Sequence, residues 1–286
     1  MNSSAALIIN PSSGSFSKKR MDQAIKLIEG RFKRVDACYT RGKGDGERLA
    51  QNLVRVGYDI IFVVGGDGTF NEVANGAAFS DIPIGFIPSG TTNVLTKELG
   101  IPNDIYGATF RILSGTERYI SLGRMNRKYF ICMAGIGFDA EAVFRVNPFI
   151  KRLSGRGAHI VSGLSVLLRY NPSNLSITID GRAYQGTNLI VCNGRLYAGN
   201  YTVCPEADIE RGSLQVFILH GTGRKDLMRC IYHVVNGTLK KMKGATLATG
   251  RNISISGRTH IQADGEFIGF SPAEISIRER ALKILS

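Results

Sequence analysis

The sequence predicts two domains: an N-terminal α/β domain with a parallel sheet, and a C-terminal antiparallel β-sandwich domain. Two observations predict this fold. Residues 1–120 repeat an apolar strand, a loop and an amphipathic helix four times, which is typical of a parallel sheet covered on both faces. After about Ile120, helical periodicity becomes scarce and short strands follow one another between Gly, Asn and Asp. We therefore expect an α/β domain over residues 1–120 and a sandwich over residues 121–286.

The elements of the first domain follow from apolar runs and their spacing. The expected strands are AALIIN (5–10), VDACYT (35–40), YDIIFVV (58–64) and IPIGFIP (82–88). The expected helices are KKRMDQAIKLIEGRF (18–32), GERLAQNLVRVG (46–57), NEVANGAAF (71–79) and the end of SGTTNVLTKELG (89–100).

The second half reads as strands. They are SITIDGRAY (176–184), TNLIVCNG (187–194), SLQVFILH (213–220), NISISG (252–257), HIQADGEFIG (260–269) and AEISIR (273–278). One basic amphipathic segment, residues 147–170, interrupts them.

Composition narrows the class of protein. Lys and Arg exceed Asp and Glu by 36 to 23, a net charge of +13 that suits anionic partners such as nucleotides or an acidic membrane surface. No zinc-finger or RNP pattern supports nucleic-acid binding, so no nucleic-acid partner is expected. The five scattered cysteines, never spaced as CxxC, favour reduced thiols over zinc or disulfides. No apolar run approaches the ~18 residues of a membrane span. Because reduced thiols are typical of the cytosol, we expect a cytoplasmic protein.

Two glycine-rich loops follow consecutive strands of the predicted sheet. They are GGDGT (65–69) and SGTTN (89–93), and both should open at the carboxyl edge, where ligands bind in such folds. Exposed main-chain N–H groups and helix N-termini favour a phosphate chain there, and Ser89, Thr91, Thr92 and Asn93 add short polar side chains. Asp67 would repel a bare phosphate but fits phosphate that arrives with Mg²⁺. Alternatively, Asp67 caps a helix in an ordinary tight turn.

The usual nucleotide signatures are absent from this sequence. It has no GxxxxGK[ST], no HRD or DFG pair, and no GxGxxG opening the first helix. These absences exclude a P-loop protein and a protein kinase, and they weaken a Rossmann dehydrogenase.

The motifs taken together resemble the diacylglycerol kinase catalytic-domain family. The similar blocks are IINPSSG, GGDGTFNEVANG, IPSGTTNVLTKELGIP, FICMAGIGFDAEAV, NGRLYAGNYTVCPEADIERGSLQV and IQADGEFIG, in family order over nearly the whole chain. The set is closest to bacterial soluble lipid kinases, which sphingosine and ceramide kinases also resemble. GGDGT alone is shared with NAD kinases and is less specific.

The resemblance implies an ATP-binding α/β domain, a lipid-binding sandwich, and an active site in the cleft between them. It implies catalytic roles for Asp264, as the general base, and for Glu266 beside it. It also implies ATP and Mg²⁺ as cofactors, with Asp67 near the metal. The nucleotide-binding residues that it implies are Asn10, Thr40, Gly66, Asp67, Gly68, Thr69, Gly90 and Thr91.

Two positions depart from the family pattern. Ser121 stands where the family usually has an aspartate that helps to hold the active-site metal through water. Arg211 follows Glu210 where a second acidic residue is usual in a structural metal loop. These departures put the metal network and the second metal in doubt. Taken by itself, Asp264 also reads as the Asp-Gly turn of a hairpin, like Asp180, and Glu266 as an exposed strand residue.

The segment from Phe149 to Leu168 allows two interpretations. Its apolar residues either pack onto the sandwich or, edged by Arg and Lys, meet anionic headgroups at a membrane. The basic run KKMKG (240–244) could reinforce a peripheral membrane role.

Three functions are weighed. The first is an ATP-dependent lipid kinase that phosphorylates a hydroxyl of diacylglycerol or a related lipid. The second is an NAD kinase, which the PSGTTN and GIGFDA blocks disfavour. The third is a non-catalytic nucleotide- or phospholipid-binding protein, motivated by Ser121 and Arg211. The acceptor lipid and the oligomeric state, including a homodimer, stay open.

Overall fold

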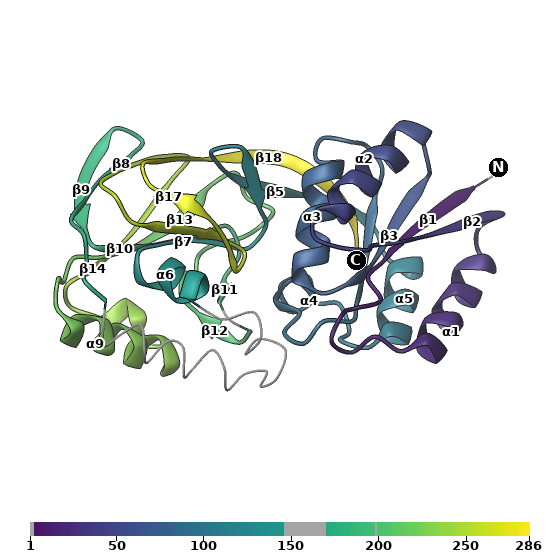
Figure 1. The fold of residues 1–286 in the computed structure, drawn as a ribbon, viewed down its shortest axis with the longest axis horizontal. Coiled ribbons are helices and arrows are strands. Elements are labelled where there is room, and N and C mark those ends of the chain that lie inside the picture. Colours follow the sequence, from purple (N-terminus) through teal and green to yellow (C-terminus); the bar gives the residue numbers. More distant parts are fainter. Residues whose placement is uncertain (1–2, 146–169, 198) are drawn as a thin grey trace. The chain divides into compact units, whose positions relative to one another are not determined.

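A computed structural model describes residues 3–145, 170–197 and 199–286 (Figure 1). The chain forms two compact units, Met1–Leu122 with Arg278–Ser286, and Gly123–Ile277. The end of the chain, Arg278–Ser286, thus belongs to the first unit, whereas the sequence expectation put it in the second domain. The predicted membrane segment, Phe149–Leu168, lies outside the described residues.

The first unit contains a parallel sheet in the order β2-β1-β3-β4-β18. Its first four strands coincide with the predicted ones, and the last part of β18 adds a fifth. The strands are β1 (Ser4–Ile9), β2 (Arg34–Tyr39), β3 (Ile60–Gly65), β4 (Ile84–Pro88) and β18 (Ala273–Leu285). The helices are α1 (Lys18–Glu29), α2 (Asp45–Val56), α3 (Asp67–Ala77), α4 (Val94–Leu99) and α5 (Ile105–Ser114). Helix α5 has no counterpart among the predicted elements.

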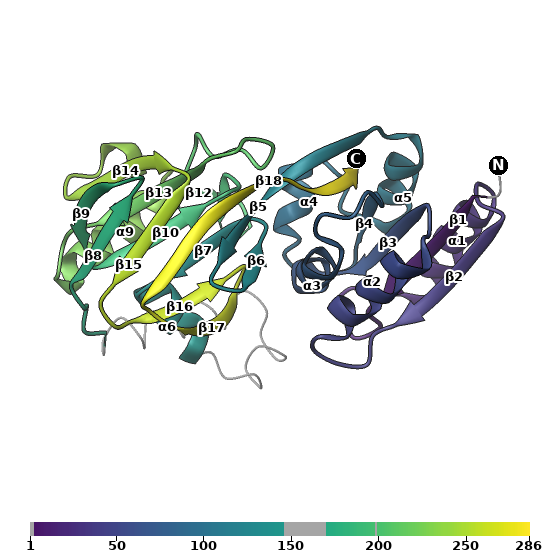
Figure 2. The same ribbon diagram turned by 90° about the horizontal axis from the view of Figure 1, so that it is seen from above.

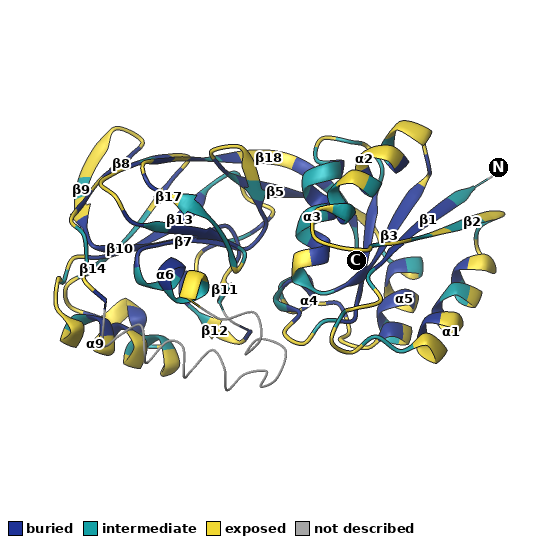
Figure 3. Ribbon diagram, in the orientation of Figure 1, coloured by how far each residue is buried: buried dark blue, intermediate teal, exposed yellow. Residues whose placement is uncertain are grey.

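Helices cover both faces of this sheet, as Figure 1 shows for α1 and α5 on one side and α2 and α3 on the other. Alternate residues of β1 and β3, among them Leu7 and Phe62, pack in one core with Met21 of α1 and Ile112 of α5. Because successive strand residues face opposite ways, the residues between them supply the second face. Both strands are buried almost throughout (Figure 3). This double burial explains their continuous apolar runs.

The second unit is a sandwich of two antiparallel sheets. One sheet has the order β14-β13-β10-β7-β16-β17; in the other, β18, β15, β8 and β9 lie side by side (Figure 2), with β5 and β6 beside β18. A single core joins residues of both sheets, such as Val191 and Ile177. The strands of the first sheet are β7 (Met133–Ile136), β10 (Asn188–Cys192), β13 (Leu214–Leu219), β14 (Ala245–Gly250), β16 (His260–Ala263) and β17 (Glu266–Phe270). The others are β5 (Glu117–Met125), β6 (Lys128–Phe130), β8 (Leu175–Ile179), β9 (Arg182–Gly186) and β15 (Asn252–Ser256), with a small ribbon of β11 (Leu196–Tyr197) and β12 (Tyr201–Thr202). The predicted fold class, a parallel α/β domain followed by an antiparallel sandwich, is confirmed.

Among the described residues of the second unit, three helical elements were not predicted. They are α6 (Phe138–Arg145), α9 (Arg224–Val235) and the short 3-10 helix η1 (Leu239–Lys241). The inner face of α9 packs through Leu227 and Cys230 in a second core that includes Phe217 of β13.

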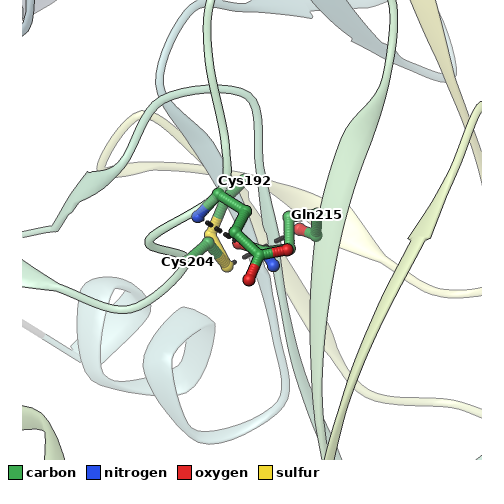
Figure 4. Close-up of a disulfide and its surroundings, with 4 residues drawn as sticks. Cys192, Cys204 and Gln215 are labelled. Atoms are coloured by element: carbon green, nitrogen blue, oxygen red, sulfur yellow. Dashed lines mark hydrogen bonds between the residues drawn. A yellow bond between two sulfur atoms is a disulfide. The ribbon is translucent and has the colours of Figure 1, made fainter. Parts of the chain in front are cut away.

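The expectation of reduced cysteines is wrong for one pair, because Cys192 and Cys204 form a disulfide (Figure 4). Cys192 ends β10, and the chain beyond β12 turns back so that the two Cα atoms lie 6.2 Å apart, within the range that a disulfide spans. The Cys204 sulfur also lies 3.6 Å from the carbonyl oxygen of Gln215. Spacing along the chain gives no sign of this return. The other three cysteines, Cys38, Cys132 and Cys230, take no part in a disulfide.

Candidate functional site

Three loops of the first unit meet at the carboxyl edge of its sheet. The strand register pairs Ile9 of β1 with Val64 of β3, and Gly65 of β3 with Pro88 of β4. The three strands therefore end at nearly the same level, and the loops that leave them begin side by side. This is the arrangement that the sequence predicts for GGDGT and SGTTN, and the NPSSG loop after β1 joins them.

The two glycine-rich loops touch through their main chains. A Cβ atom on Gly90 would lie 2.6 Å from the Cα of Gly66, closer than folded proteins tolerate. Next to this contact, the Ser89 N–H donates to the Gly65 carbonyl over 2.7 Å. The glycines are therefore needed first for loop-to-loop packing, and Gly68 and Thr91 remain exposed at the surface of the pair.

The loop after β1 is fixed onto this pair by side chains. The side-chain amide of Asn10 donates its NH₂ group to the Thr69 hydroxyl over 2.9 Å, and its side-chain oxygen accepts the Ser12 N–H. The hydroxyls of Ser13 and Ser89 lie 2.6 Å apart. Ser89 is fully buried, so it holds the loops together and does not present its hydroxyl to a ligand.

Asn93 also differs from its predicted role. It was expected to offer its side chain to phosphate, but it is buried in a left-handed conformation before α4. Its amide donates to the Gly90 carbonyl over 3.1 Å and to the Asn103 side chain over 2.6 Å. Because these bonds shape the loop from within, the polar side chains left on the outside are those of Thr91 and Thr92.

Asp67 joins the first turn of α3 to the first turn of α4. Its two carboxylate oxygens accept the N–H groups of Val94 over 3.0 Å and Leu95 over 3.1 Å. Burial raises the pKa of this carboxyl above its ordinary value, while the two N–H bonds and nearby Lys97 act in the opposite direction. Asp67 thus caps a helix, as the alternative interpretation held, but the helix is α4 and not its own. A carboxylate oxygen that accepts one N–H still has a lone pair for a cation.

The loop between β2 and α2 is held by a residue that the sequence analysis did not single out. Glu72 of α3 accepts the N–H of Gly44 over 2.7 Å and that of Gly46 over 2.9 Å. Thr40 begins this loop, and its N–H donates to Ile9 at the end of β1. Glu72 lies in the quoted motif GGDGTFNEV, but the two glycines that it holds lie at the start of α2, so only the fold reveals its role.

Asp264 occupies a hairpin turn in the second unit, between β16 and β17. It has a positive φ of 46° and is followed by Gly265 at 80°, the backbone of an Asp-Gly turn. Its carboxylate accepts three main-chain N–H groups, from Ile131 (2.6 Å), Cys132 (2.9 Å) and Met133 (2.9 Å). These bonds fix the carboxylate in one orientation against the turn between β6 and β7.

The other Asp-Gly hairpin has the same local structure. Asp180 has a φ of 46°, and its carboxylate accepts the N–H groups of Arg251 (2.8 Å) and Asn252 (2.9 Å) on the neighbouring strand. The hairpin interpretation of both turns is therefore correct.

A half-buried carboxylate stands close to the Asp264 turn. Asp139 of α6 accepts a bond from the Gln262 amide over 2.6 Å and another from the Tyr197 hydroxyl, and Gln262 in turn accepts the Gly265 N–H over 2.8 Å. Burial raises the pKa of Asp139. Sequence reasoning missed this link, although an aspartate within the apolar block GIGFDA is itself an unusual feature.

Ser121 and Arg211, which depart from the family pattern, lie in different parts of the fold. Ser121 is buried on β5. Arg211 forms an ion pair with Asp208 over 3.4 Å, in a loop where Glu210 donates its N–H to the Asp208 side chain. Within the described ranges, no three His, Cys, Asp or Glu side chains are grouped so as to hold a metal ion. None of the helices in those ranges is long and apolar enough to cross a bilayer.

The predicted site residues thus fall into two sets. Asp264 and Glu266 belong to the hairpin of the second unit. The other eight lie in the loops of the first unit, where hydrogen bonds or main-chain contacts join most of them; these are Asn10, Thr40, Gly66, Asp67, Gly68, Thr69, Gly90 and Thr91.

Comparison with known proteins identifies the family. A family model described as the diacylglycerol kinase catalytic domain matches residues 4–125, and one described as the YegS C-terminal NAD kinase beta sandwich-like domain matches residues 132–286. Two Staphylococcus aureus proteins named diacylglycerol kinase, from strains RF122 and JH9, are each 30% identical over 100% of this chain and 93% of their own.

Solved structures share the fold. A structure described as a diacylglycerol kinase from Bacillus anthracis str. Sterne matches with a TM-score of 0.80 at 23% identity, over 99% of this chain and 96% of that one. Another from the same organism reaches 0.84 at 23% identity, over 99% and 94%. At this identity the structures establish the fold alone. The matched family models and the full-length relatives show that this chain belongs to the diacylglycerol kinase family.

Proposed function

We propose that this protein is an ATP-dependent lipid kinase that transfers the γ-phosphate to a hydroxyl of diacylglycerol or a related lipid. The observation that carries the proposal is the packing of GGDGT against SGTTN, main chain on main chain, at the carboxyl edge of a parallel sheet. Such an edge offers N–H groups and a helix start to an anion. Membership of the diacylglycerol kinase family supports phosphate transfer from ATP to a lipid hydroxyl as the reaction that this edge would serve.

The first unit would bind the nucleotide. Gly66, Gly68 and Gly90 would let phosphate oxygens approach the main chain closely, and Thr91 would add an exposed hydroxyl. Asn10, Thr40 and Thr69 would shape the rest of this surface. Loops that are already packed together lose little freedom on binding, so their N–H groups would be in place before ATP arrives.

Asp67 fits a role beside Mg²⁺. Kinases typically hold this ion with one or two carboxylates and with phosphate oxygens, and Asp67 keeps lone pairs beside its two N–H bonds. When bound, Mg²⁺ neutralises charge on the phosphate oxygens. The amides of α4 would keep the Asp67 carboxylate oriented for that contact, and the charge of nearby Lys97 favours its ionised form by lowering the pKa.

Asp264 of the second unit would be the general base, with Glu266 beside it. The lipid oxygen forms a bond to the γ-phosphorus as the bond to the β–γ bridging oxygen breaks, and ADP leaves with that electron pair. The hydroxyl proton passes to Asp264. Three main-chain donors already orient this carboxylate, which lowers the cost of aligning it with the acceptor.

The acceptor is an amphiphile, so we infer that the protein works as a peripheral protein on an anionic membrane surface. The net charge of +13 supports this inference. No nucleic-acid partner is proposed.

A transfer assay with radiolabelled ATP tests the function. The panel contains diacylglycerol, monoacylglycerol, phosphatidylglycerol, a sphingoid base and a polyprenol in mixed micelles, with NAD as a soluble acceptor and Mg²⁺ varied. We expect label in one of the lipids, dependent on Mg²⁺. Label in NAD and in none of the lipids would establish the NAD kinase alternative. ATP binding without transfer to any acceptor would favour a non-catalytic binding protein.

A further inference from the structure

Helix α9 of the second unit is apolar on two faces. Its inner face packs into the core, yet Met228, Ile231, Tyr232 and Val235 are 58, 41, 64 and 56% exposed. Their spacing of three, four and seven residues places them on one side of the helix, and Figure 3 shows this helix with its exposed residues outward. Scattered apolar side chains on a surface are ordinary, but a continuous stripe marks an interaction surface.

Basic residues surround this stripe. Residues 224–243 contain six Lys or Arg and a single acidic residue, Asp226. Arg224, Lys225 and Arg229 are exposed on α9 itself. The run KKMKG, which the sequence analysis considered for a peripheral membrane role, follows α9 and includes the end of η1. Asp226 pairs with Arg229 over 3.6 Å, and Glu206 pairs with Lys240 over 2.8 Å. The surface around the stripe therefore keeps a marked positive charge.

We propose that the exposed face of α9, with the basic residues around it, docks the protein on an anionic lipid bilayer. An apolar stripe edged by Lys and Arg is the pattern of helices that lie in the membrane interface. Tyr232 adds a ring that is apolar with a polar tip, which suits the headgroup level. This inference rests on the proposed peripheral association and names the surface that would carry it.

The charges argue against a second copy of the chain as the occupant. In a symmetric pair, the same patch would face itself. Arg224, Lys225 and the lysines of KKMKG would then approach their own equivalents, and like charges across an interface weaken it. Anionic headgroups neutralise those same side chains.

The first test removes the apolar stripe from the full-length chain. Vesicles of phosphatidylcholine with phosphatidylglycerol are sedimented with protein, without ATP and without diacylglycerol, so that catalysis plays no part. The combined change Met228→Ser, Ile231→Ser and Tyr232→Ser should weaken binding at least ~10-fold. The matched control is Tyr106→Ser with Phe110→Ser, an exposed pair on α5 of the first unit, which should bind as wild type does.

The second test changes charge alone. Lys225→Glu with Lys241→Glu should weaken binding by ~5-fold or more for each residue. Added salt should reduce this difference between the variant and wild type, because it screens the charges. Lys19→Glu with Lys26→Glu on α1 alters net charge equally and should have less effect. Pure phosphatidylcholine vesicles should bind the wild type weakly.

Each outcome bears on the proposal. If wild type binds no anionic vesicles, both the peripheral association and the docking face are wrong, while lipid kinase activity is judged separately by the transfer assay. If the α9 variants bind as wild type does, or if the controls lose as much binding, α9 is not the docking face. If the stripe variant only turns a dimer into a monomer in the ultracentrifuge, the face binds a second copy instead. An unchanged melting temperature of the variants excludes misfolding as the cause.

Discussion

Two carboxylates, one in each unit, are held in the same way for different purposes. Asp67 accepts two N–H groups from the start of α4, and Asp264 accepts three from the turn between β6 and β7. The first joins two loops that follow neighbouring strands of a parallel sheet; the second joins a hairpin to a turn within a sandwich. A carboxylate that the sequence singles out for metal or proton chemistry is, in both cases, also part of the local architecture. Experiments on either residue must therefore separate the two contributions.

The largest effect is expected from Asp264→Asn. The amide cannot take up a proton, so we expect the rate of lipid phosphorylation to fall ~10²–10⁴-fold while ATP binding persists. The same change replaces an acceptor oxygen by an NH₂ group that faces N–H donors, which costs about 1–3 kcal/mol of unfolding free energy. Steady-state kinetics and denaturant unfolding measure the two effects.

Asp180→Asn is the matched control for that change. Asp180 has the same turn geometry and also accepts main-chain N–H groups, so its loss of stability should be similar. Its kinase activity should stay near that of wild type. If Asp180→Asn lost activity as severely as Asp264→Asn, the effect at Asp264 would be structural and the general-base role would fall.

Gly90→Ala should have the next largest effect, in the first unit. The new methyl group would meet the main chain of Gly66, so the two loops must separate, at a cost of about 1–3 kcal/mol. We expect a higher KM for ATP and a lower melting temperature. Gly42→Ala, where a methyl group meets open space, should alter stability by no more than about 0.5 kcal/mol. Equal effects of both changes would contradict the packing argument.

Glu72→Gln should give a smaller and more selective change. The amide keeps one acceptor oxygen for two N–H groups, which loosens the loop that begins at Thr40 by about 1 kcal/mol. We expect the KM for ATP to rise about fivefold with little change in kcat. Glu29→Gln, exposed on α1, is the control. A fall in kcat at unchanged KM would mean that this loop acts in the chemical step and not in binding.

The smallest expected effect is a pH dependence of stability that comes from Asp67. Burial raises the folded-state pKa above the ordinary value of 3.8, so ionising this carboxyl costs more in the folded state than in the unfolded chain. Its contribution to stability is greatest below the unfolded pKa and is lost as pH rises through the folded pKa. A folded-state pKa that lies one pH unit above the unfolded-state pKa corresponds to about 1.4 kcal/mol of stability.

Denaturant unfolding of wild type and Asp67→Asn between pH 4 and 7 measures this contribution. As pH falls, the free energy of unfolding of wild type should increase relative to that of Asp67→Asn. The opposite slope would mean that the N–H bonds from Val94 and Leu95 outweigh burial. In that case the pKa of Asp67 in the folded protein would lie below that of the unfolded chain, as is usual for a hydrogen-bonded carboxylate at the surface.

Much of the fold could be predicted because its signals are local. The apolar runs of β1 and β3, the helical spacing of α1 and α2, and the Asp-Gly turns at Asp180 and Asp264 each lie within a dozen residues. Helix α9 escaped prediction although its apolar residues have helical spacing, because it lies between two strands, β13 and β14, in a half of the chain that was interpreted as sheet. The Cys192–Cys204 disulfide depends on a chain return that has no local signal.

The candidate site likewise has some features that the sequence predicts and others that it does not. Its glycine loops could be predicted from the order of strand, loop and helix. The partners of Asp67 and Glu72 could not, because the N–H groups that they accept lie at the starts of other helices, more than twenty residues away along the chain. The buried positions of Ser89 and Asn93 likewise depend on loops that approach them only in the folded unit.

Strand β18 has a consequence for how the protein can be made. Ile284 and Leu285 pair with β4, and the Phe79 N–H donates to Ala281, so the edge of the first unit is completed by residues that follow the whole sandwich along the chain. A ribosome must release the entire sandwich before this edge can close. Until then β4 presents an open edge, at which a nascent chain is prone to pair wrongly. A polypeptide cut after Leu122 would keep that edge permanently, and solubility would be the first property to suffer.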